Sequence, residues 1–543
     1  MDQKLIRFLL IQYFTISVYL EFTSHCHAHM TTSCKQTPYP EVCEHYVGPP
    51  PQTLDGTDGL TFHDLSIKST IDLTKQLHRL VSDSKRRRFL SKCATSALFD
   101  CLELYRDTLL QLNRSTNRHF PSSMDIQTSL SAAIANQETC KNGFFDFNLT
   151  SYSTYFPLEM HRNLSKSLSN SLAVTKAAAD ESSAAAFTEF NKQGHFGGSG
   201  RRLLLSGEKF PLWVSYSDRK LLESLETTAK ADLVVAKDGS GHYTSVSKAV
   251  EAAMRLHRQE KSGNRFVIYV KAGIYNENIE IKRSMKNLMV VGDGIDSTVI
   301  TGNRNVRDGT TTFQSATFAV TGEGFIGRDI TFENTAGPTK HQAVALRSGS
   351  DFSVFYRCSF KGYQDTLYIH SNRQFYRNCD IYGTIDFIFG DAAAVLQRCN
   401  IFVRRPMSGQ KNTVTAHARK DPNENTGIVI HDSIVTAAED GTAETYLGRP
   451  WRMYSRTVFM KCFLGGVVSP VGWLEWSGDF ALSTLYYGEY MNSGPGANIS
   501  DRVKWPGFQV LMTASEASKF TVGNFLAGNS WIPAAGVPFD YGL

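Results

Sequence analysis

Several motifs by which hydrolytic enzymes are commonly recognised are missing from this 543-residue chain. It has no H-E-x-x-H and no C-x-x-C pair, so the usual ligand spacings of a zinc site are absent. It also has no G-x-S-x-G, the motif that presents the nucleophile of many serine esterases. We therefore expect no metal and no organic cofactor, and any catalysis must rest on other side chains.

An excess of charge of one sign is also missing. The chain has 57 Lys and Arg residues against 52 Asp and Glu residues, which gives a formal net charge of +5. Neither half is basic enough to indicate a nucleic-acid partner. The composition, 41% hydrophobic and 20% charged, excludes a disordered or collagen-like chain, and the length suggests more than one domain.

Beyond the N-terminus no apolar stretch is long enough to span a bilayer, so we expect no stable membrane span. At the N-terminus, Lys4 and Arg7 precede the apolar run Phe8–Leu20, which predicts a secretory signal peptide over residues 1–28. This run is shorter than the ~20 residues of a membrane span, although a signal anchor is the alternative. Four N-x-S/T sequons fit a secreted glycoprotein, at Asn113, Asn148, Asn163 and Asn498.

Valine and glycine are scarce in one half of the chain and abundant in the other. Residues 56–188 contain two valines and three glycines, whereas residues 206–543 contain 27 valines, and 37 of the 41 glycines lie beyond residue 188. Few valines and glycines favour helix, while valine-rich segments broken by glycine favour strand. We predict an all-α helical-bundle domain over residues 31–188 and an all-β domain over residues 212–543.

The segment between the halves, residues 189–211, is typical of an exposed linker. It contains Gly-Gly-Ser-Gly at residues 197–200, and the basic pair Arg201 and Arg202 follows directly. Flexible segments of this composition are preferred sites of proteolysis. We predict that a processing protease cuts the chain at Arg201 and Arg202; the alternative is a linker that is never cut.

Apolar residues at helical spacing mark the faces on which the bundle helices pack. The two clearest faces comprise Ile126, Leu130, Ala133, Ile134, Gln137 and Cys140, and Leu90, Ala94, Ala97, Cys101, Leu104 and Tyr105. A cysteine on each face predicts a Cys101–Cys140 disulfide, and Cys34 and Cys43, nine residues apart, predict a second. Spacing alone does not determine the connectivity, and Cys93 is left over.

A short pattern recurs along the C-terminal half: cysteine or aspartate, any residue, then an aliphatic or aromatic residue. Its first residues, 28, 21, 20, 33 and 30 positions apart, are Ile330 (a looser match), Cys358, Cys379, Cys399, Asp432 and Cys462. The β-rich segments between them are short and no amphipathic helix intervenes. This predicts a right-handed parallel β-helix, whereas the alternative, a β-sandwich, prefers strands about 8–12 residues apart. The stacked cysteines are either buried thiols or disulfides.

The repeat places two aspartates at equivalent positions of adjacent coils. Asp365 lies seven residues after Cys358, and Asp386 lies seven residues after Cys379. Adjacent strands are about 4.8 Å apart, so the two carboxyl groups are within interaction range. Two close carboxylates repel each other and one tends to keep its proton, which suits acid–base chemistry. The alternative is a pair of structural aspartates at turns, each bonded to backbone N–H groups.

Neighbouring side chains favour the catalytic interpretation. Asp386 lies in an apolar, aromatic run, where an ionised carboxylate needs a partner, and Arg449 is the candidate because its planar guanidinium binds carboxylates in two places. Gln342 and Gln364 offer neutral amide donors, which suit an oxyanion that develops during a reaction.

The chain resembles plant-type pectin methylesterases (pectinesterases) that carry an N-terminal pectin methylesterase inhibitor-like prosegment. In the C-terminal half the resemblance rests on Gly362–Tyr368, Gly383–Gly390, Leu447–Trp451 and Tyr486–Tyr490. In the N-terminal half it rests on Cys34–Cys43, Ala97–Cys101 and Asn136–Cys140. It covers nearly everything after the signal peptide, and the family's right-handed parallel β-helix agrees with the repeat.

The resemblance implies a role for each of the five polar residues. Asp386 matches the family's nucleophile, and Asp365 matches its general acid/base. Gln342 and Gln364 match its oxyanion-stabilising glutamines, and Arg449 matches the arginine that orients the nucleophile.

Other matched positions concern the substrate cleft. Tyr368, Trp451 and Trp473 match the family's sugar-contacting aromatics, although packed cores select similar residues. His417 and Asp391 depart from the family's pattern, since they stand where glutamine and asparagine are commoner. These departures leave the five polar residues unchanged.

The resemblance implies hydrolysis of galacturonate methyl esters in homogalacturonan pectin, with release of methanol, in the extracellular cell wall. Pectin is then the substrate, and inhibitor proteins and a processing protease are the other expected partners of a monomeric enzyme. The bundle is expected to cover the cleft until the linker is cut, or to assist folding or export. Two other functions are left open: a galacturonan-cleaving hydrolase or lyase on the same fold, and a non-enzymatic chain whose bundle inhibits a separate pectin methylesterase.

Overall fold

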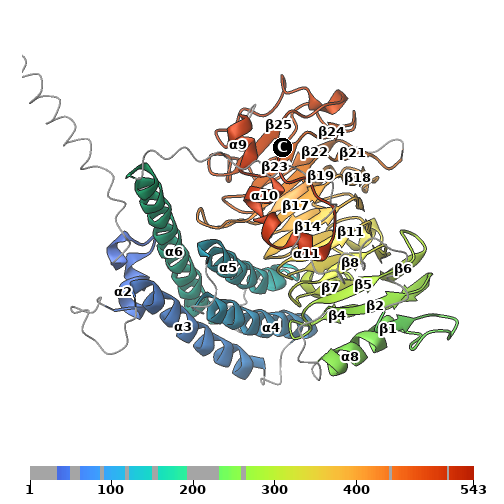
Figure 1. Cartoon of the computed structure of the whole chain (residues 1–543), viewed down its shortest axis with the longest axis horizontal. Coiled ribbons are helices and arrows are strands. Elements are labelled where there is room, and N and C mark those ends of the chain that lie inside the picture. Colours follow the sequence, from blue (N-terminus) through green and yellow to red (C-terminus); the bar gives the residue numbers. More distant parts are fainter. Residues whose placement is uncertain are drawn as a thin grey trace, which may run out of the picture.

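The computed structural model describes residues 33–48, 61–85, 91–116, 122–149, 157–192, 231–257, 265–439, 443–509 and 513–543. The predicted signal peptide and the predicted cut at Arg201 and Arg202 lie outside these residues. The described chain forms a helical N-terminal region, which we call the bundle, packed against one side of a larger β structure (Figure 1).

The bundle consists of four long helices preceded by a short helical hairpin. Its elements are η1 (Cys34–Gln36), α2 (Pro40–Tyr46), α3 (Phe62–Lys85), α4 (Lys92–Ser115), α5 (Ser123–Phe145) and α6 (Leu158–Lys192). Serine side chains cap two of the helices: Ser91 accepts from the N–H of Ala94 in α4, and Ser122 accepts from the N–H of Asp125 in α5. Helix α6 continues to Lys192, past the predicted linker start at residue 189.

Both predicted disulfides of the bundle are confirmed. Cys34–Cys43 joins η1 to α2, and Cys101–Cys140 joins the predicted apolar faces of α4 and α5. Cys93 has a free thiol.

The four sequons all lie on described residues. Asn113, Asn148 and Asn498 are exposed, whereas Asn163 is half-buried and its Nδ2 donates to the Tyr46 hydroxyl (3.3 Å). Glycosylation at these positions stays a prediction.

The C-terminal part is a parallel β-helix built from three sheets, as predicted (Figure 1). The 11-stranded sheet contains β1 (Leu233–Val235), β2 (Phe266–Val270), β5 (Leu288–Val291), β8 (Ile326–Arg328), β11 (Ser353–Tyr356), β14 (Arg373–Arg377), β17 (Ala393–Gln397), β20 (Gly427–His431), β23 (Arg456–Met460), β25 (Tyr486–Tyr490) and β26 (Phe508–Gln509). The 8-stranded sheet contains β3 (Gly273–Asn276), β6 (Thr298–Gly302), β9 (Thr331–Asn334), β12 (Ser359–Lys361), β15 (Asp380–Gly383), β18 (Asn400–Val403), β21 (Ile434–Ala437) and β24 (Phe463–Leu464). The 7-stranded sheet contains β4 (Ile279–Ile281), β7 (Phe318–Val320), β10 (Leu346–Ser348), β13 (Leu367–Ile369), β16 (Ile388–Gly390), β19 (Asn412–His417) and β22 (Thr445–Gly448).

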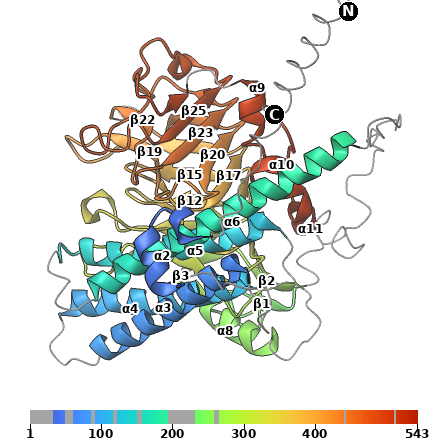
Figure 2. The same ribbon diagram turned by 90° about the vertical axis from the view of Figure 1, so that its left-hand side faces the viewer.

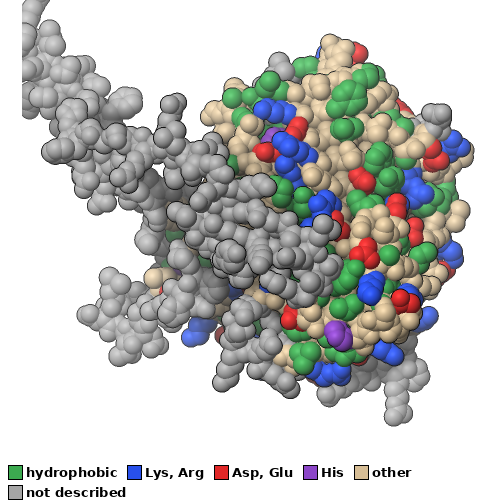
Figure 3. All heavy atoms as spheres, turned by 45° about the vertical axis from the view of Figure 1, so that its right-hand side comes forward, with side chains coloured by type: hydrophobic (Ala, Val, Ile, Leu, Met, Phe, Trp, Pro, Cys, Tyr) green, Lys and Arg blue, Asp and Glu red, His purple; other side chains and the backbone are tan. Residues whose placement is uncertain are grey.

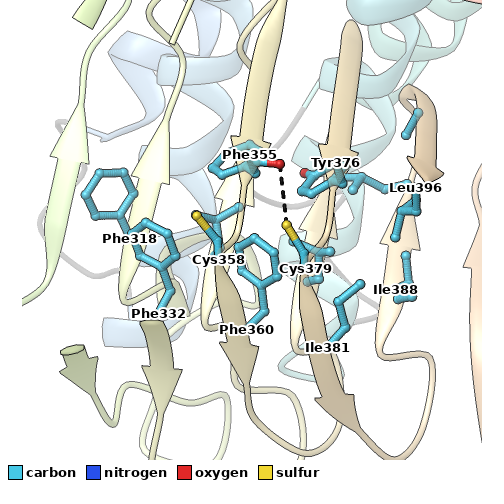
Figure 4. Packing of buried hydrophobic residues seen from close by; sticks show 14 of the residues in the cluster. Phe318, Phe332, Phe355, Cys358, Phe360, Tyr376, Cys379, Ile381, Ile388 and Leu396 are labelled. Atoms are coloured by element: carbon cyan, nitrogen blue, oxygen red, sulfur yellow. Dashed lines mark hydrogen bonds between the residues drawn. The ribbon is translucent and has the colours of Figure 1, made fainter. Parts of the chain in front are cut away.

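The interior of the β-helix is filled by ladders of apolar side chains. Each side chain stacks on the residue at the same position of the next coil, as Phe355 does on Tyr376, whose ring centroids lie 4.9 Å apart (Figure 4). Cys358 and Cys379 belong to one such ladder. Both are free, fully buried thiols, and the thiol of Cys379 contacts the carbonyl oxygen of Phe355 at 3.4 Å (Figure 4). The alternative of disulfides between adjacent coils is therefore excluded for these cysteines.

The predicted register of the repeat is wrong by one residue at Asp432. The pairing of Asn400 with Ile434 places Ser433, not Asp432, after Cys399 in the ladder. Ile434 is consequently 44% exposed, because a one-residue shift moves a strand residue to the opposite face.

Helices cover two regions of the β-helix. Helix α8 (Val246–His257) packs against β1, β2 and β4, where the β-helix begins. The C-terminal helices α9 (Ala514–Ser518), α10 (Val522–Phe525) and α11 (Ile532–Ala535) supply buried side chains that pack on the outer face of the 11-stranded sheet. Acidic and basic side chains are interspersed over the face shown in Figure 3.

The bundle packs on the outer face of the 7-stranded sheet. A single apolar cluster combines bundle residues with Phe313, Tyr368 and Phe389 of the β-helix. Viewed from the side of the bundle, its helices lie in front of the strands (Figure 2). No helix among the described residues is long and apolar enough to cross a membrane.

Candidate active site

Asp386 lies in the turn between β15 and β16, and its side chain accepts three hydrogen bonds. Its backbone is left-handed, with φ of 50°, a conformation that aspartate tolerates better than most residues. The Thr413 hydroxyl donates to Oδ1 (2.6 Å). Arg449, directly after β22, donates through Nε to Oδ1 (2.8 Å) and through Nη2 to Oδ2 (2.6 Å). The bidentate pair fixes both oxygens of the carboxylate.

Asp365 occupies the equivalent turn one coil earlier, between β12 and β13. The pairing of Leu367 with Ile388 puts it in register with Asp386, and both side chains line one cavity. Burial raises the pKa of Asp365 well above its ordinary value, and the negative charge of Asp386 raises it further. Asp365 therefore favours the protonated state, beside an aspartate whose oxygens both accept hydrogen bonds from an arginine.

All five predicted polar residues line this cavity, which we call the aspartate cavity and which has a volume of about 540 Å³. The β-helix contributes Thr312, Phe313, Gln342, Gln364, Asp365, Tyr368, Asp386, Phe389, Ala416, Arg449, Trp451, Arg452 and Trp476. Gln342 and Gln364 are half-buried beside the two aspartates. The cavity thus combines a hydrogen-bonded carboxylate, a second carboxyl group that favours its proton, and two amide side chains.

Two of the three predicted sugar-contacting aromatics line the aspartate cavity, and the third does not. Tyr368 stacks on Phe389 with ring centroids 4.3 Å apart, and Trp451 lies beside Phe389 at 5.9 Å. Trp473 is 1% exposed inside the β-helix, where it stacks on Tyr487. The prediction for Trp473 is therefore wrong, because the interior of the β-helix selected an aromatic residue at this position.

Two residues of the site were missed by the sequence analysis. Trp476 lines the aspartate cavity, and its ring packs against the guanidinium of Arg449 (4.5 Å to the ring centroid). Thr413 holds Asp386 and is in register with it on the next coil, since Ile388 pairs with Thr415. Extending the repeat by one coil would have found Thr413, but the 27-residue spacing is longer than that of the two coils before it.

The bundle forms one wall of the aspartate cavity. Its contributions come from α5 and the turn that follows: Thr139, Lys141, Asn142, Gly143, Phe145, Asp146 and Asn148. The Thr139 hydroxyl lies 3.1 Å from the Tyr368 hydroxyl and 3.0 Å from His370 Nε2. Asp146 accepts from the N–H of Thr312 (2.8 Å), and burial raises the pKa of Asp146 to about 6.

An ion cluster joins α5 to the β-helix at the edge of the cavity. Lys420 donates to Glu138 Oε1 (2.6 Å), and Arg452 donates to Glu138 Oε2 (3.1 Å) and to Asn142 Oδ1 (2.6 Å). Burial alone would raise the pKa of Glu138, but the charges of Lys420 and Arg452 lower it to about 2. Glu138 is therefore ionised throughout the ordinary pH range.

The two residues that depart from the family's pattern are neighbours behind the cavity. His417 Nε2 lies 3.7 Å from Asp391 Oδ1, and both side chains are buried. Burial lowers the pKa of His417 well below its ordinary value and raises the pKa of Asp391 to about 6. Neither residue lines the aspartate cavity. Among the described residues, no cluster of His, Cys, Asp and Glu has the geometry of a metal site.

The comparison with family models identifies the class of protein to which this β-helix and its cavity belong. The model described as Pectinesterase matches residues 232–529, and the model described as Plant invertase/pectin methylesterase inhibitor matches residues 28–174. The chain belongs to the pectinesterase family, and its bundle is a domain of the inhibitor family.

Individual relatives agree with both assignments. The chain is 66% identical to "Probable pectinesterase/pectinesterase inhibitor 6" of Arabidopsis thaliana, over 97% of this chain and 96% of that protein. It is 50% identical to "Pectinesterase 2" of Citrus sinensis, over 94% of each chain. Among solved structures, "Pectin methylesterase from Carrot" is 57% identical, with a TM-score of 0.56, and matches 58% of this chain and 98% of its own length.

Proposed function

We propose that this protein hydrolyses the methyl esters of galacturonate residues in homogalacturonan pectin, with Asp386 and Asp365 as catalytic residues. The observation that carries the proposal is the pair of aspartates on adjacent coils, one bound by Arg449 and the other favouring its proton. The names of the relatives support the substrate. The apolar run after Lys4 and Arg7 and the four sequons support secretion, and the substrate supports the cell wall as the destination.

In the first half of the reaction, a carboxylate oxygen of Asp386 attacks the carbonyl carbon of the ester. The negative charge that develops on the carbonyl oxygen is stabilised by the amide groups of Gln342 and Gln364. The bond to the methoxy oxygen then breaks, and Asp365 gives its proton to the departing group, which leaves as methanol. The product is an anhydride between Asp386 and the galacturonate.

In the second half, water hydrolyses the anhydride. Asp365, now ionised, takes one proton from the water while the remaining hydroxyl bonds to the acyl carbon. Asp386 leaves as a carboxylate and returns to its hydrogen bonds with Arg449. The net reaction consumes one ester and one water, releases one methanol and leaves one free carboxyl group on the uncut polysaccharide.

The bundle suppresses this activity in the intact chain by occupying the substrate cleft. Thr139 engages the hydroxyl of Tyr368, and the turn after α5 forms a wall of the aspartate cavity. A polysaccharide chain cannot reach Asp386 along a cleft that the bundle fills. Cutting the linker and releasing the bundle then activates the enzyme.

Substitution of the two aspartates tests the catalytic assignment. The full chain is produced with a specific protease site between residues 193 and 230, cut, and freed of the bundle. Asp386→Ala and Asp365→Ala should each lower methanol release from esterified pectin by at least about 10³-fold, because each removes a reacting group. Asp380→Asn is the matched control, since this aspartate bonds Asn400 on the 8-stranded sheet, away from the cleft. Retention of most activity in either alanine variant would refute the assignment.

Viscosity measured in the same reaction separates the esterase from a chain-cleaving enzyme. Methanol release without a fall in the viscosity of pectin is expected. A rapid fall in viscosity would instead indicate a galacturonan hydrolase or lyase on the same fold.

Adding the released bundle back to the enzyme tests the suppression. Methanol release should fall at least about tenfold at saturating bundle and recover on dilution. Glu138→Lys in the bundle should weaken this effect, because it places a cation against Lys420 and Arg452. Glu41→Lys is the control, since Glu41 pairs with Lys166 on the exposed outer side of the bundle. Unchanged activity with saturating wild-type bundle would contradict the proposal.

A further inference from the structure

The motif Tyr486–Tyr490 and the buried Trp473 have no part in the reaction described above. The motif forms β25, near the C-terminal end of the β-helix (Figure 1). The indole Nε1 of Trp473 donates to Oε1 of Glu489 in this motif (3.2 Å). The indole ring also stacks on Tyr487 of the same motif, with centroids 4.1 Å apart. The motif therefore holds Trp473 both by a hydrogen bond and by ring stacking.

Glu489 also forms a buried ion pair with Arg502. Arg502 donates through Nε to Glu489 Oε1 (2.8 Å) and through Nη2 to Oε2 (3.1 Å). The guanidinium also donates to the carbonyl oxygens of Pro470 (2.9 Å) and Gly496 (2.7 Å). A buried ion pair is weak evidence for stability, since well-packed apolar residues often serve as well. What this pair fixes is the position of the segment that contains Pro470 and Trp473.

This segment is the outer neighbour of the strand that leads to Arg449. Strand β22 lies at one edge of the 7-stranded sheet, and the described chain continues the sheet beyond it only through bridges, one of which joins Gly448 to Trp473. The N–H of Leu474 donates to the carbonyl oxygen of Gly448 (3.0 Å). A Cβ at Gly448 would lie 3.3 Å from the ring of Trp473. Because Arg449 is the next residue, Trp473 supports the backbone from which its side chain extends.

The same segment also contacts the guanidinium of Arg449 directly. Trp476 follows Trp473 by three residues, and the centroid of its ring lies 4.5 Å from Cζ of Arg449. With Trp473 fixed inside the β-helix, little freedom is left for the ring of Trp476 outside it. Arg449 is thus held by the carboxylate of Asp386, by the ring of Trp476 and, through its backbone, by Trp473.

We propose that the buried pair of Arg502 and Glu489 positions Arg449. The link runs from the ion pair to the indole of Trp473, and from the indole to the backbone and the aromatic ring that hold the guanidinium. None of these three supporting residues lines the aspartate cavity, so they act only through Arg449. The inference rests on the proposed function, because Arg449 orients the proposed nucleophile, Asp386.

The test uses enzyme that is produced as the full chain, cut in the linker and freed of the bundle. Trp473→Phe keeps a ring that can stack on Tyr487 but removes the N–H that reaches Glu489. We expect kcat for methanol release from esterified pectin to fall about 10–100-fold with KM nearly unchanged, because a displacement of about 1 Å at a reacting group costs up to this order. Glu489→Gln/Arg502→Met, which removes the pair without leaving an unpaired buried charge, should have the same effect.

A double-mutant cycle separates positioning from a general loss of structure. Trp473→Phe is combined with Arg449→Lys, which keeps a charge beside Asp386 but lacks the planar fork that binds both of its oxygens. If Trp473 acts through the guanidinium, adding Trp473→Phe to Arg449→Lys should change kcat by no more than about twofold. A merely structural role would instead give the full loss on both backgrounds.

A second ion pair, between Arg357 and Asp329, provides the matched control. Arg357 donates through Nε to Oδ1 (2.6 Å) and through Nη2 to Oδ2 (2.7 Å) of Asp329. Both residues lie in turns that join the 11-stranded sheet to the 8-stranded sheet, away from the cleft. Arg357→Gln/Asp329→Asn should therefore leave kcat and KM unchanged.

Several outcomes would overturn the inference. An unchanged kcat in Trp473→Phe or in Glu489→Gln/Arg502→Met would do so, as would a rise in KM alone or equal losses on the two backgrounds of the cycle. If one of these variants does not fold, the other takes its place in the cycle and decides. Failure of the wild type to release methanol from pectin would refute the proposed function itself.

Discussion

The bundle and the β-helix reach a buried interior by different routes. The bundle packs four long helices, most of them against the next helix in the chain, and disulfides fasten α4 to α5 and η1 to α2. In the β-helix each coil packs on the next, and Cys358, Cys379, Cys399 and Cys462 remain free thiols. The difference shows that a repeated coil serves as a template for its neighbour, whereas a small bundle gains from covalent closure.

The seam between the two domains differs from both interiors. Inside the β-helix the ladders are apolar, but at the seam Asp100, Asp146 and Asp365 are buried with raised pKa values. Such groups cost stability where they stand, and their concentration at one surface is typical of a site that binds or reacts. The proposed catalytic residues and the bundle residues proposed to block them both lie at this seam.

The largest expected effect on the difference between the two domains comes from removing a disulfide of the bundle. The double variant Cys101→Ala/Cys140→Ala should lower the free energy of unfolding of the bundle by about 4 kcal/mol, because the bond closes a long loop. The β-helix should keep its stability. All six tryptophans lie beyond residue 212, so tryptophan fluorescence reports the β-helix while far-ultraviolet circular dichroism at 222 nm follows the helices.

A matched control comes from the ladder of thiols. Cys379→Ala removes one buried sulfur without opening a covalent bond, and should cost only about 1–2 kcal/mol in the β-helix. Equal losses in both domains for the double variant would contradict the view that they are stabilised independently.

The next effect concerns the seam and depends on pH. Burial raises the pKa of Asp100 to about 7 and that of Asp146 to about 6, so the docked bundle holds protons that the free bundle releases. The resulting contribution to the affinity of the bundle for the enzyme is fully present below the ordinary pKa of aspartate. It is lost as the pH rises through 6 to 7. Burial also raises the pKa of Glu103, which therefore acts in the same direction. Burial lowers the pKa of His370 to about 3, so at a pH below the ordinary pKa of histidine this residue must lose a proton on docking and weakens the affinity.

The two aspartates outweigh the single histidine. The affinity of the cut bundle for the enzyme should therefore fall about 20-fold between pH 5 and 7.5, measured by titration of one with the other. In Asp100→Asn/Asp146→Asn the fall should disappear. An affinity of the wild type that increases over this range would show that His370 dominates.

The smallest effect sharpens the description of the aspartate pair. Thr413→Val removes the hydroxyl that donates to Asp386 but leaves both bonds from Arg449. We expect kcat to fall about tenfold with KM nearly unchanged, the order of one hydrogen bond to a charged group. Thr415→Val is the control on the same strand, since its hydroxyl donates to the Leu447 carbonyl. A fall in KM alone would contradict a role in holding Asp386.

The repeat allowed the fold and the aspartate pair to be predicted together. Cys358 and Cys379 define a spacing that Asp365 and Asp386 share, and the pairing of β13 with β16 confirms that register. The register failed at Asp432 because a longer loop precedes it and both Ile434 and Val435 are apolar. Only strand pairing decides which of two adjacent apolar residues faces inward.

The aromatic residues also show that the sequence alone does not decide which side chains face the interior of the β-helix. Trp473 and Trp476 lie three residues apart with similar composition around them, yet one packs inside the β-helix and the other lines the cavity. Burial and substrate contact both favour large flat side chains, so residue type does not separate them.

By itself the sequence determined the two fold classes and the alignment of the aspartates, because each depends on a local period or on a spacing that the chain repeats. It predicted both disulfides of the bundle, but their connectivity came from the structure. The tertiary structure alone decided that α4 and α5 lie across the 7-stranded sheet. No period encodes which surfaces of two domains meet, since that choice depends on complementary shape and charge between residues hundreds of positions apart.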